Sequence, residues 1–206
     1  YAAAAKLGYD AADVQWTRTT FDVAIAPGAK DFDWNLQQFS ITEDREKAVD
    51  FSSSYYDVNQ AIVSYAGSPI ADAKTRPDLE SAKLGAAVGG TSLDAAQQLA
   101  TGEEVAVFND NAAAVSALKN EQIDGLVVDL PTAFYLVAAE LDEGVIVGQL
   151  PAAEGDTTDQ FGILLPNNSA LTQCTTQAVD QLRADGTLDS LEATWLGSDA
   201  GAPTLQ

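Results

Sequence analysis

The sequence predicts an α/β protein in which helices flank mostly parallel sheets, and three observations lead to that fold class. Between residues 79 and 150, short apolar segments alternate with helical segments, which is the pattern of β-α-β units with right-handed crossovers. Apolar and polar residues alternate over 32–40, as in a strand with one buried face. An amphipathic pattern over 169–184 predicts a long helix after the alternating region 79–150.

The first 65 residues are predicted to contain three strands and parts of three helices. In chain order, the expected elements are a helix that ends at Gly8, a strand at 13–17, a weak helix at 21–25, a strand at 32–40, a helix that begins at Thr42 and a strand at 61–65. Gly8 is a typical helix stop because glycine adopts the left-handed conformation at little cost. No capping residue precedes this first helix, so we expect the chain to open partway through a domain.

The other elements follow from short apolar runs that have capping residues, glycine or proline at their ends. The expected strands are 84–88, 105–108, 123–128, 145–147 and 161–166. The expected helices are 93–100, 112–118, one that begins near Pro131, 169–184 and one over 188–195 that Gly197 closes. The final segment, 198–206, is small and polar, and we expect it to be a frayed end.

Charge and residue types exclude several classes of function. The 206 residues include 10 Lys and Arg against 31 Asp and Glu, a formal net charge of −21, and so few basic residues argue against a nucleic-acid partner. The chain has no His and one Cys, so neither a Ser-His-Asp triad nor a His or Cys metal site can form. We expect no catalytic residues, metal or cofactor. No apolar run approaches the ~18 residues that span a bilayer, and no segment shows the basic start and long apolar run expected of a signal peptide.

Candidate binding residues follow three of the expected strands, at the strand ends where open α/β sheets bind their ligands. They are Ser40, Thr42 and Arg45 after the first strand, Gly89, Gly90, Thr91 and Ser92 after the second, and Asp129 after the third. A guanidinium suits a carboxylate, and a glycine-rich turn at a helix N-terminus offers backbone N–H groups to an anion. With Asp129 available for an ammonium group, the set complements a zwitterion, of which an α-amino acid is the simplest.

Each candidate also has a purely structural interpretation. Arg45 stands among acidic residues and could form a surface ion pair. The GGTS segment at 89–92 could be an ordinary strand-to-helix turn, and Asp129 could cap the helix that follows it. Phe21 could belong to the core rather than to a ligand platform. Cys174 lies on the apolar face of its helix and is expected to be a small buried hydrophobe.

Four motifs occur in order along nearly the whole chain. The segment 39–56, FSITEDREKAVDFSSSYY, contains an S/T-I-T-x-x-R turn, an apolar-Asp-Phe-Ser segment and a Tyr pair. The segments 89–92 and 123–131 supply a G-T-S turn and a strand that ends in Asp. The segment 161–197 supplies a strand, a long helix with an ADGTL turn, and a terminal Trp-x-Gly. This series resembles the extracytoplasmic solute-binding proteins of ABC importers, in the polar amino-acid binding family, family 3.

The resemblance implies a two-lobed, periplasmic-binding-protein-like fold of type II with two hinge strands. Lobe 1 would comprise 1–64 and 160–206, without the family's first strand and the start of its first helix, and lobe 2 would comprise 66–158. By position, Arg45 would hold the α-carboxylate of the ligand and Asp129 its α-ammonium group. The further binding residues would be Ser40, Thr91, Ser92, Gly90, Phe21 and Gln38.

The resemblance also implies a function. The protein would bind a polar α-amino acid outside the cytoplasm and deliver it to the membrane permease of an ABC importer. It would be a monomer and not an enzyme, in the periplasm or as a cell-surface lipoprotein, with its signal peptide removed. Two alternatives stay open: a dehydratase of the cyclohexadienyl or arogenate type on the same scaffold, which needs a general acid in the cleft, and the ligand-binding sensor domain of a receptor.

Overall fold

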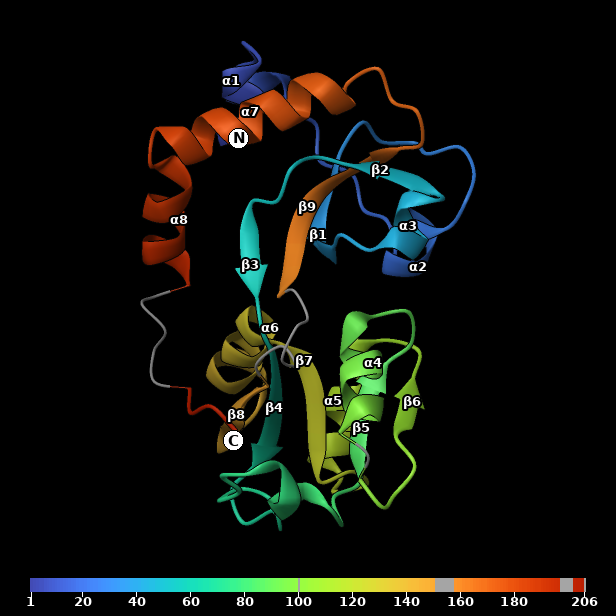
Figure 1. Cartoon of the computed structure of the whole chain (residues 1–206), viewed down its shortest axis with the longest axis vertical. Helices are drawn as coiled ribbons and strands as arrows, with labels where there is room; N and C mark the ends of the chain where they lie inside the picture. The colour runs from blue at the N-terminus through green and yellow to red at the C-terminus, as the bar shows by residue number, and fades with distance from the viewer. Residues whose placement is uncertain (100, 151–157, 197–201, 206) are drawn as a thin grey trace. The chain divides into compact units, whose positions relative to one another are not determined.

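The computed structural model describes residues 1–99, 101–150, 158–196 and 202–205 (Figure 1). The contacts between residues divide the chain into two compact units. Unit 1 consists of Tyr1–Asp57 and Asp159–Ser198, and unit 2 of Val58–Thr158 and Asp199–Gln206. The chain therefore passes from one unit to the other after Asp57, again before Asp159, and a last time after Ser198.

The sheet of unit 1 is built around β9 (Asp159–Pro166). This strand pairs antiparallel with β1 (Asn35–Ser40) and with β2 (Val49–Phe51), and it also pairs with β3 (Tyr56–Val58). The described pairings thus differ from the mostly parallel sheet expected for this lobe.

Short helices surround this sheet. Among the described residues of unit 1 they are α1 (Ala2–Lys6), the 3-10 turn η1 (Ala11–Asp13), α2 (Phe21–Ile25), α3 (Glu43–Glu46), α7 (Thr172–Ala184) and α8 (Thr187–Trp195). The prediction of a helix at 21–25 is confirmed. The long helix also ends where predicted, since Gly186 follows α7 with a left-handed φ of 76°. Fully buried Phe39 and Leu164 lie in the small apolar core of this unit.

The strand predicted at 13–17 does not form. Residues 14–20 have no regular structure, and within the described part of the chain β1 pairs through one edge only, with β9. One side-chain hydrogen bond, from Gln37 Nε2 to the carbonyl oxygen of Thr19 (3.3 Å), joins this segment to β1. A strand forms only where its backbone N–H and C=O groups pair with those of a neighbour, and the bond that joins this segment to β1 comes from a side chain instead.

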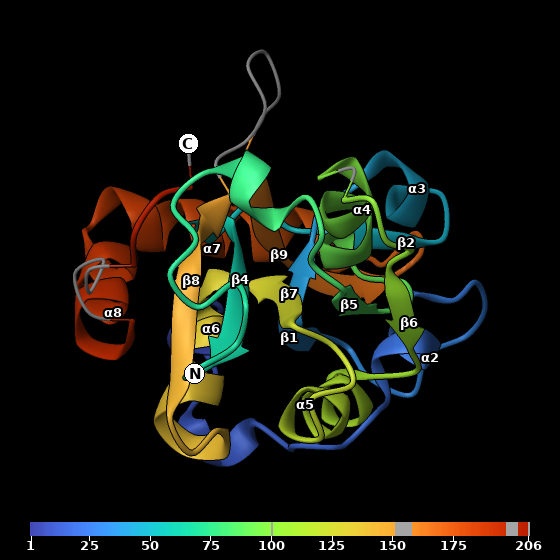
Figure 2. The same ribbon diagram turned by 90° about the horizontal axis from the view of Figure 1, so that it is seen from below.

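Unit 2 contains a five-stranded sheet in the order β6-β5-β7-β4-β8, which Figure 2 shows from the side of the strand ends. The strands are β4 (Gln60–Tyr65), β5 (Leu84–Ala87), β6 (Ala106–Phe108), β7 (Gly125–Asp129) and β8 (Gly144–Leu150). β5 runs parallel to β6 and β7, whereas β4 runs antiparallel to β7 and β8. The predicted β-α-β alternation is confirmed for β5, β6 and β7.

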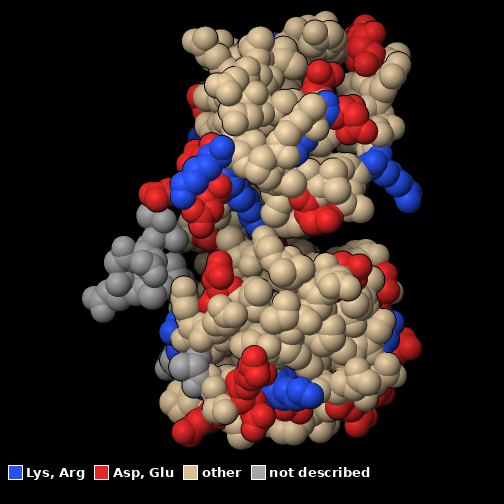
Figure 3. All heavy atoms as spheres, turned by 90° about the vertical axis from the view of Figure 1, so that its right-hand side faces the viewer, with Lys and Arg blue, Asp and Glu red and all other residues tan. Residues whose placement is uncertain are grey.

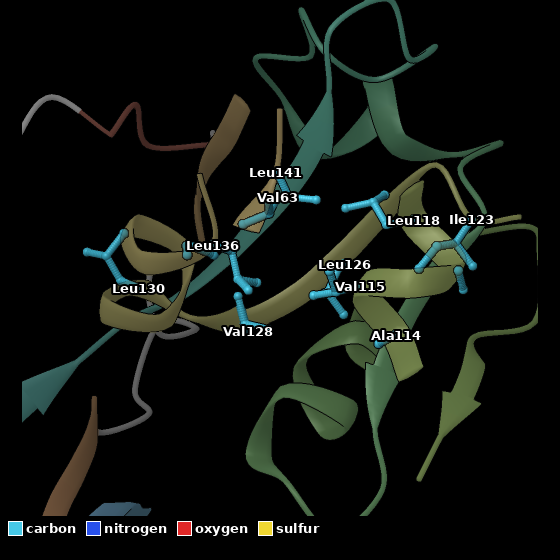
Figure 4. Close-up of a cluster of buried hydrophobic side chains, with 13 residues drawn as sticks. Val63, Ala114, Val115, Leu118, Ile123, Leu126, Val128, Leu130, Leu136 and Leu141 are labelled. Carbon is cyan, nitrogen blue, oxygen red and sulfur yellow. The ribbon is translucent and has the colours of Figure 1, made fainter. Parts of the chain in front are cut away.

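Helices cover both faces of this sheet. They are η2 (Arg76–Leu79), α4 (Thr91–Gln98), α5 (Asn111–Lys119), α6 (Leu130–Tyr135) and its one-turn extension η3 (Leu136–Glu140), as far as the structure describes this unit. One apolar cluster joins alternate residues of β4 and β7 to α5 and α6, including Val63, Leu126 and Leu118 (Figure 4). The intervening residues, such as Ile62 and Val127, pack on the other face with α4. Near-continuous apolar strands are expected when both faces of a sheet are covered.

The boundary between the units differs from the expected one near residue 64. The strand β4 (Gln60–Tyr65) lies in the sheet of unit 2 and pairs with both β7 and β8, although residues 60–64 were expected in lobe 1. The apolar run predicts a strand correctly but not its sheet, because β pairing joins residues far apart in sequence.

The end of the chain also differs from expectation. The backbone N–H of Gln149 donates to the carbonyl of Pro203 (2.7 Å), and the N–H of Leu205 donates to the carbonyl of Gln149 (3.0 Å). Leu205 is 1% exposed and fills space beside Gly148, where an added Cβ would lie 2.6 Å from Leu205 Cγ. The expectation of a frayed tail in lobe 1 is therefore wrong for residues 202–205, which pack on unit 2. Residue 100 and Gly197, expected in or next to helices, lie outside the described residues.

Candidate functional site

Arg45 is a buried cation in unit 1. The hydroxyl of Thr42 accepts a hydrogen bond from the backbone N–H of Arg45 (3.2 Å), which begins α3 as predicted. The Arg45 side chain turns back, and its Nη1 donates to the carbonyl oxygen of Ser40 (2.7 Å). Lys47 is the cation that pairs with Asp44 at the surface, which lowers the pKa of that carboxyl. Arg45 itself is 8% exposed, which argues against its interpretation as a surface residue.

Phe21 connects Arg45 to the core of unit 1. Its ring stacks on that of Phe39, with 4.7 Å between centroids, and Arg45 Cζ lies 5.4 Å from the centroid of the Phe21 ring. A guanidinium at this distance from a ring is attracted by its quadrupole. Phe21 therefore packs on the core, as its structural interpretation predicts, and its ring also contacts the Arg45 guanidinium.

Two more candidates lie along β1. Ser40 is 2% exposed, and its backbone carbonyl is the acceptor for Arg45. The register of β1 against β9 shifts between Asn35 and Phe39, and within this irregularity Gln38 has a φ of 58°. A left-handed conformation costs a non-glycine residue about 1–2 kcal/mol. Such irregularities turn a side chain away from the direction that the strand would give it, and Gln38 is exposed.

The GGTS segment of unit 2 opens α4, as predicted. Gly89 has a left-handed φ of 77°, so this is the position of the turn that requires glycine. Gly90 is the N-cap residue in an extended conformation, and a Cβ there would meet only ordinary contacts. Thr91 and Ser92 are the first two residues of the helix, and both are half-buried.

Asp129 ends β7 and precedes α6. Its side chain makes no capping hydrogen bond to that helix, which argues against the interpretation as a cap. Instead, Asp129 Oδ1 accepts a hydrogen bond from Nε2 of Gln60 at 2.8 Å. Asp129 and Gln60 face each other because they are paired in the antiparallel register of β7 and β4.

Gln60 is the residue that the sequence analysis missed. It is 7% exposed and contacts three of the candidates: besides Asp129, its Nε2 donates to Thr91 Oγ1 (3.2 Å) and its Oε1 accepts from Ser92 Oγ (2.7 Å). The only signal in the sequence is a polar residue at the start of the apolar strand AIVSY. The structure thus brings Thr91, Ser92 and Asp129 together within unit 2, and Arg45, Ser40 and Phe21 together within unit 1.

The remaining charged groups are dispersed. Figure 3 shows Asp and Glu side chains scattered over the face seen there. No group of three or more Asp, Glu or Cys side chains that could hold a metal ion occurs among the described residues. In that same part of the chain, no helix is long and apolar enough to cross a membrane.

Cys174 is half-buried, and its thiol donates to the carbonyl of Leu171 (3.1 Å).

These features define an α/β protein that holds a buried cation in one unit and an oriented carboxylate in the other. The chain belongs to the bacterial extracellular solute-binding proteins, family 3, whose sequence profile matches residues 1–198. The predicted family and the two-lobed type II fold are both confirmed.

Individual relatives agree with this assignment. The L-cystine-binding protein TcyJ of Escherichia coli K12 is 28% identical over 173 residues, which are 83% of this chain and 62% of TcyJ. The chain thus spans about three fifths of the length of this curated relative. An ancestral arginine-binding protein bound to glutamine superposes with a TM-score of 0.76 at 29% identity, covering 96% of this chain and 84% of the other. An ancestral amino acid-binding protein, AncCDT-1, a precursor of cyclohexadienyl dehydratase, gives a TM-score of 0.72 at 26% identity and covers 94% and 80%.

Proposed function

We propose that the protein binds a polar α-amino acid outside the cytoplasm and delivers it to the permease of an ABC importer. In this proposal it is a monomer, located in the periplasm or on the cell surface as a lipoprotein after removal of its signal peptide. Arg45 holds the α-carboxylate and Asp129 the α-ammonium group. Ser40, Gly90, Thr91 and Ser92 add hydrogen bonds from backbone or side chain, and Phe21 and Gln38 contact the ligand side chain.

The observation that carries the proposal is the pair of opposite charges held by separate units. Arg45 is buried and positioned by a backbone carbonyl and a ring face, and Asp129 is oriented by an amide. A zwitterion that contacts both units stabilises the form in which both contacts are made, and this differential affinity is what drives closure. The relatives support an amino acid as the ligand, since they are named for cystine, arginine and amino acids in general.

The enzymatic alternative is not favoured. The family and the relatives are binding proteins, and AncCDT-1 is itself described as an amino acid-binding protein that preceded a dehydratase. A general acid would need a carboxyl group kept protonated near neutral pH. Asp129, the carboxylate among the candidate residues, instead accepts a hydrogen bond from the amide of Gln60.

Calorimetry against the common α-amino acids, with L-cystine included, tests the proposal. We expect at least one of them to bind, and Arg45→Ala to weaken that binding about 100-fold or more, since loss of a buried charge contact costs ~2–5 kcal/mol. Arg18→Ala is the matched control because Arg18 is exposed, and it should leave the affinity unchanged. Absence of binding by all of them, or unchanged affinity in Arg45→Ala, contradicts the proposal. Turnover of an aromatic-acid precursor to an aromatic product would favour the dehydratase instead.

A further inference from the structure

Gln60 contacts several polar side chains at the carboxyl end of β7. It lies at the start of β4, and its amide reaches Asp129 on β7 and both Thr91 and Ser92 at the start of α4. Its three bonds therefore join side chains from three elements of unit 2. The backbone that carries it is rigid, because the next two residues, Ala61 and Ile62, are fully buried in the sheet.

The direction of each hydrogen bond follows from the chemistry of the partners. An ionised carboxylate can only accept, so the amide must turn its Nε2 toward Asp129, and Oε1 then faces the other way. The second proton of Nε2 points to Thr91 Oγ1, which therefore accepts a bond from Gln60. Since Oε1 can only accept, Ser92 must donate its hydroxyl proton to Gln60.

These bonds fix the Gln60 amide in one orientation, since Thr91 accepts from its Nε2 and Ser92 donates to its Oε1. Asp129 is held in one orientation by a bond on Oδ1.

We propose that Gln60 is a positioning residue that orients the Asp129 carboxylate of the ligand site in unit 2. It directs this carboxylate toward the α-ammonium group, and its bonds to Thr91 and Ser92 hold its own amide in place. This inference rests on the proposed function, because it assigns roles within that site. Gln60 itself does not contact the ligand in this proposal; it contacts the side chains that do.

The most informative substitution is Gln60→Glu. Glutamate has the same length and can still accept from Ser92, but an ionised carboxylate cannot donate to Asp129 or Thr91, and it repels Asp129. Gln60→Met removes all three bonds with a similar volume and without a new charge, so it keeps the test valid if Gln60→Glu fails to fold. Asn59→Ala is the matched control: Asn59 is the adjacent residue, and its Nδ2 donates to Gln149 Oε1 (3.1 Å), outside this network.

The readout is a ratio of affinities measured by calorimetry. The probes are L-arginine with 5-guanidinopentanoic acid, and L-glutamine with glutaramic acid, in which the second member of each pair lacks the α-amino group. We use the pair whose amino acid binds the wild type more tightly. The ratio is the dissociation constant of the analogue without the α-amino group divided by that of the amino acid, and a large ratio indicates recognition of the α-ammonium group. We expect Gln60→Met to reduce this ratio about tenfold, Gln60→Glu to reduce it further, and Asn59→Ala to leave it unchanged.

The possible outcomes separate the two proposals. If neither L-arginine nor L-glutamine binds the wild type, the pair is rebuilt on whichever amino acid the panel identifies; if none binds, the proposed function fails. If the wild type binds but Gln60→Met keeps its affinity ratio, the inference about Gln60 is overturned and the function stands. A folded Gln60→Met that weakens both members of the pair equally also overturns it, because that pattern indicates a general structural role. Additive effects of Gln60→Met and Asp129→Asn would contradict it as well, since residues acting as one unit are not additive.

Discussion

The two units hold their charged groups in different ways. In unit 1, Arg45 is buried, and it is positioned by the backbone carbonyl of Ser40 and by the ring of Phe21. In unit 2, Asp129 is half-buried and depends on Gln60, whose amide also binds Thr91 and Ser92. The support of Arg45 thus includes a backbone carbonyl, which no substitution removes, beside one ring, whereas the support of Asp129 is a side-chain amide.

This difference implies different sensitivities. A backbone carbonyl remains when its residue is replaced, so changes around Arg45 should alter affinity only by moving the guanidinium. In unit 2, a single side-chain change propagates, because one amide satisfies three partners at once. We therefore expect substitutions next to Asp129 to affect recognition more than comparable substitutions next to Arg45.

The largest effect in unit 2 is expected from Asp129→Asn. The substitution keeps the shape of the side chain but removes the charge that faces the α-ammonium group, so affinity should fall about 100-fold, or ~3 kcal/mol. Calorimetry with the best-bound amino acid measures the change. Asp94→Asn, on an exposed position of α4, controls for the loss of one negative charge and should have no effect. Equal losses in both variants would mean that overall charge, rather than Asp129, determines affinity.

The second prediction compares the stabilities of the units. Leu205→Ala truncates a fully buried side chain that packs against β8. We expect the free energy of unfolding of unit 2 to fall by about 2 kcal/mol, which is at the low end for such changes because a chain end can relax. Hydrogen exchange read by mass spectrometry should show faster exchange in β8 and β4, with β1 and β9 unchanged. Leu191→Ala, at a position 40% exposed in α8, is the control and should cost little. Slower or unaltered exchange in β8 would show that the tail does not support this sheet.

Local sequence signals account for much of the fold but not for its long-range pairings. The strands near 84–88, 105–108 and 123–128 are found at β5, β6 and β7 because each is an apolar run bounded by turn residues. The strands β2 and β3 were not predicted, since each has three residues and forms only against β9, more than a hundred residues later.

The site follows the same division. Arg45, Thr91, Ser92 and Asp129 could be selected because each follows a predicted strand. Gln60 could not be, because its importance comes from the register that pairs it with Asp129. Sequence alone likewise allows Phe21 either a core position or a place against the ligand, and its contacts with Phe39 and Arg45 show the packing role.

A third prediction concerns Phe21. Phe21→Leu removes the ring beside Arg45 but keeps an apolar contact with Phe39, so we expect a loss of affinity of about fivefold, or ~1 kcal/mol. Phe134→Leu is the matched control, because Phe134 is a half-buried ring packed on the core of unit 2. Both variants should lose comparable stability in chemical denaturation, and only Phe21→Leu should lose affinity. If affinity is unchanged in Phe21→Leu, the ring does not position the guanidinium.

The smallest effect is expected at the surface of unit 1. Lys6 Nζ lies 2.6 Å from Asp185 Oδ2, and hydrogen bonds from Lys6 and Thr187 lower the pKa of Asp185 to about 2. Because the pKa is depressed in the folded state, this carboxylate contributes stability above its ordinary pKa near 4, and the contribution is lost as pH falls toward 2. Lys6→Met should therefore melt at a slightly lower temperature than the wild type at pH 6, and the difference should disappear near pH 2. High salt should also reduce it, and a difference that grows at low pH would contradict the assignment.

The most direct test of the account is a crystal structure of the protein grown with the amino acid that binds it most tightly. We expect one molecule bound with its α-carboxylate in a two-point contact with the Arg45 guanidinium. Its α-ammonium group should lie within hydrogen-bonding distance of Asp129, with Gln60 Nε2 still on the Asp129 carboxylate. A ligand whose carboxylate or ammonium group is held by other residues would contradict it.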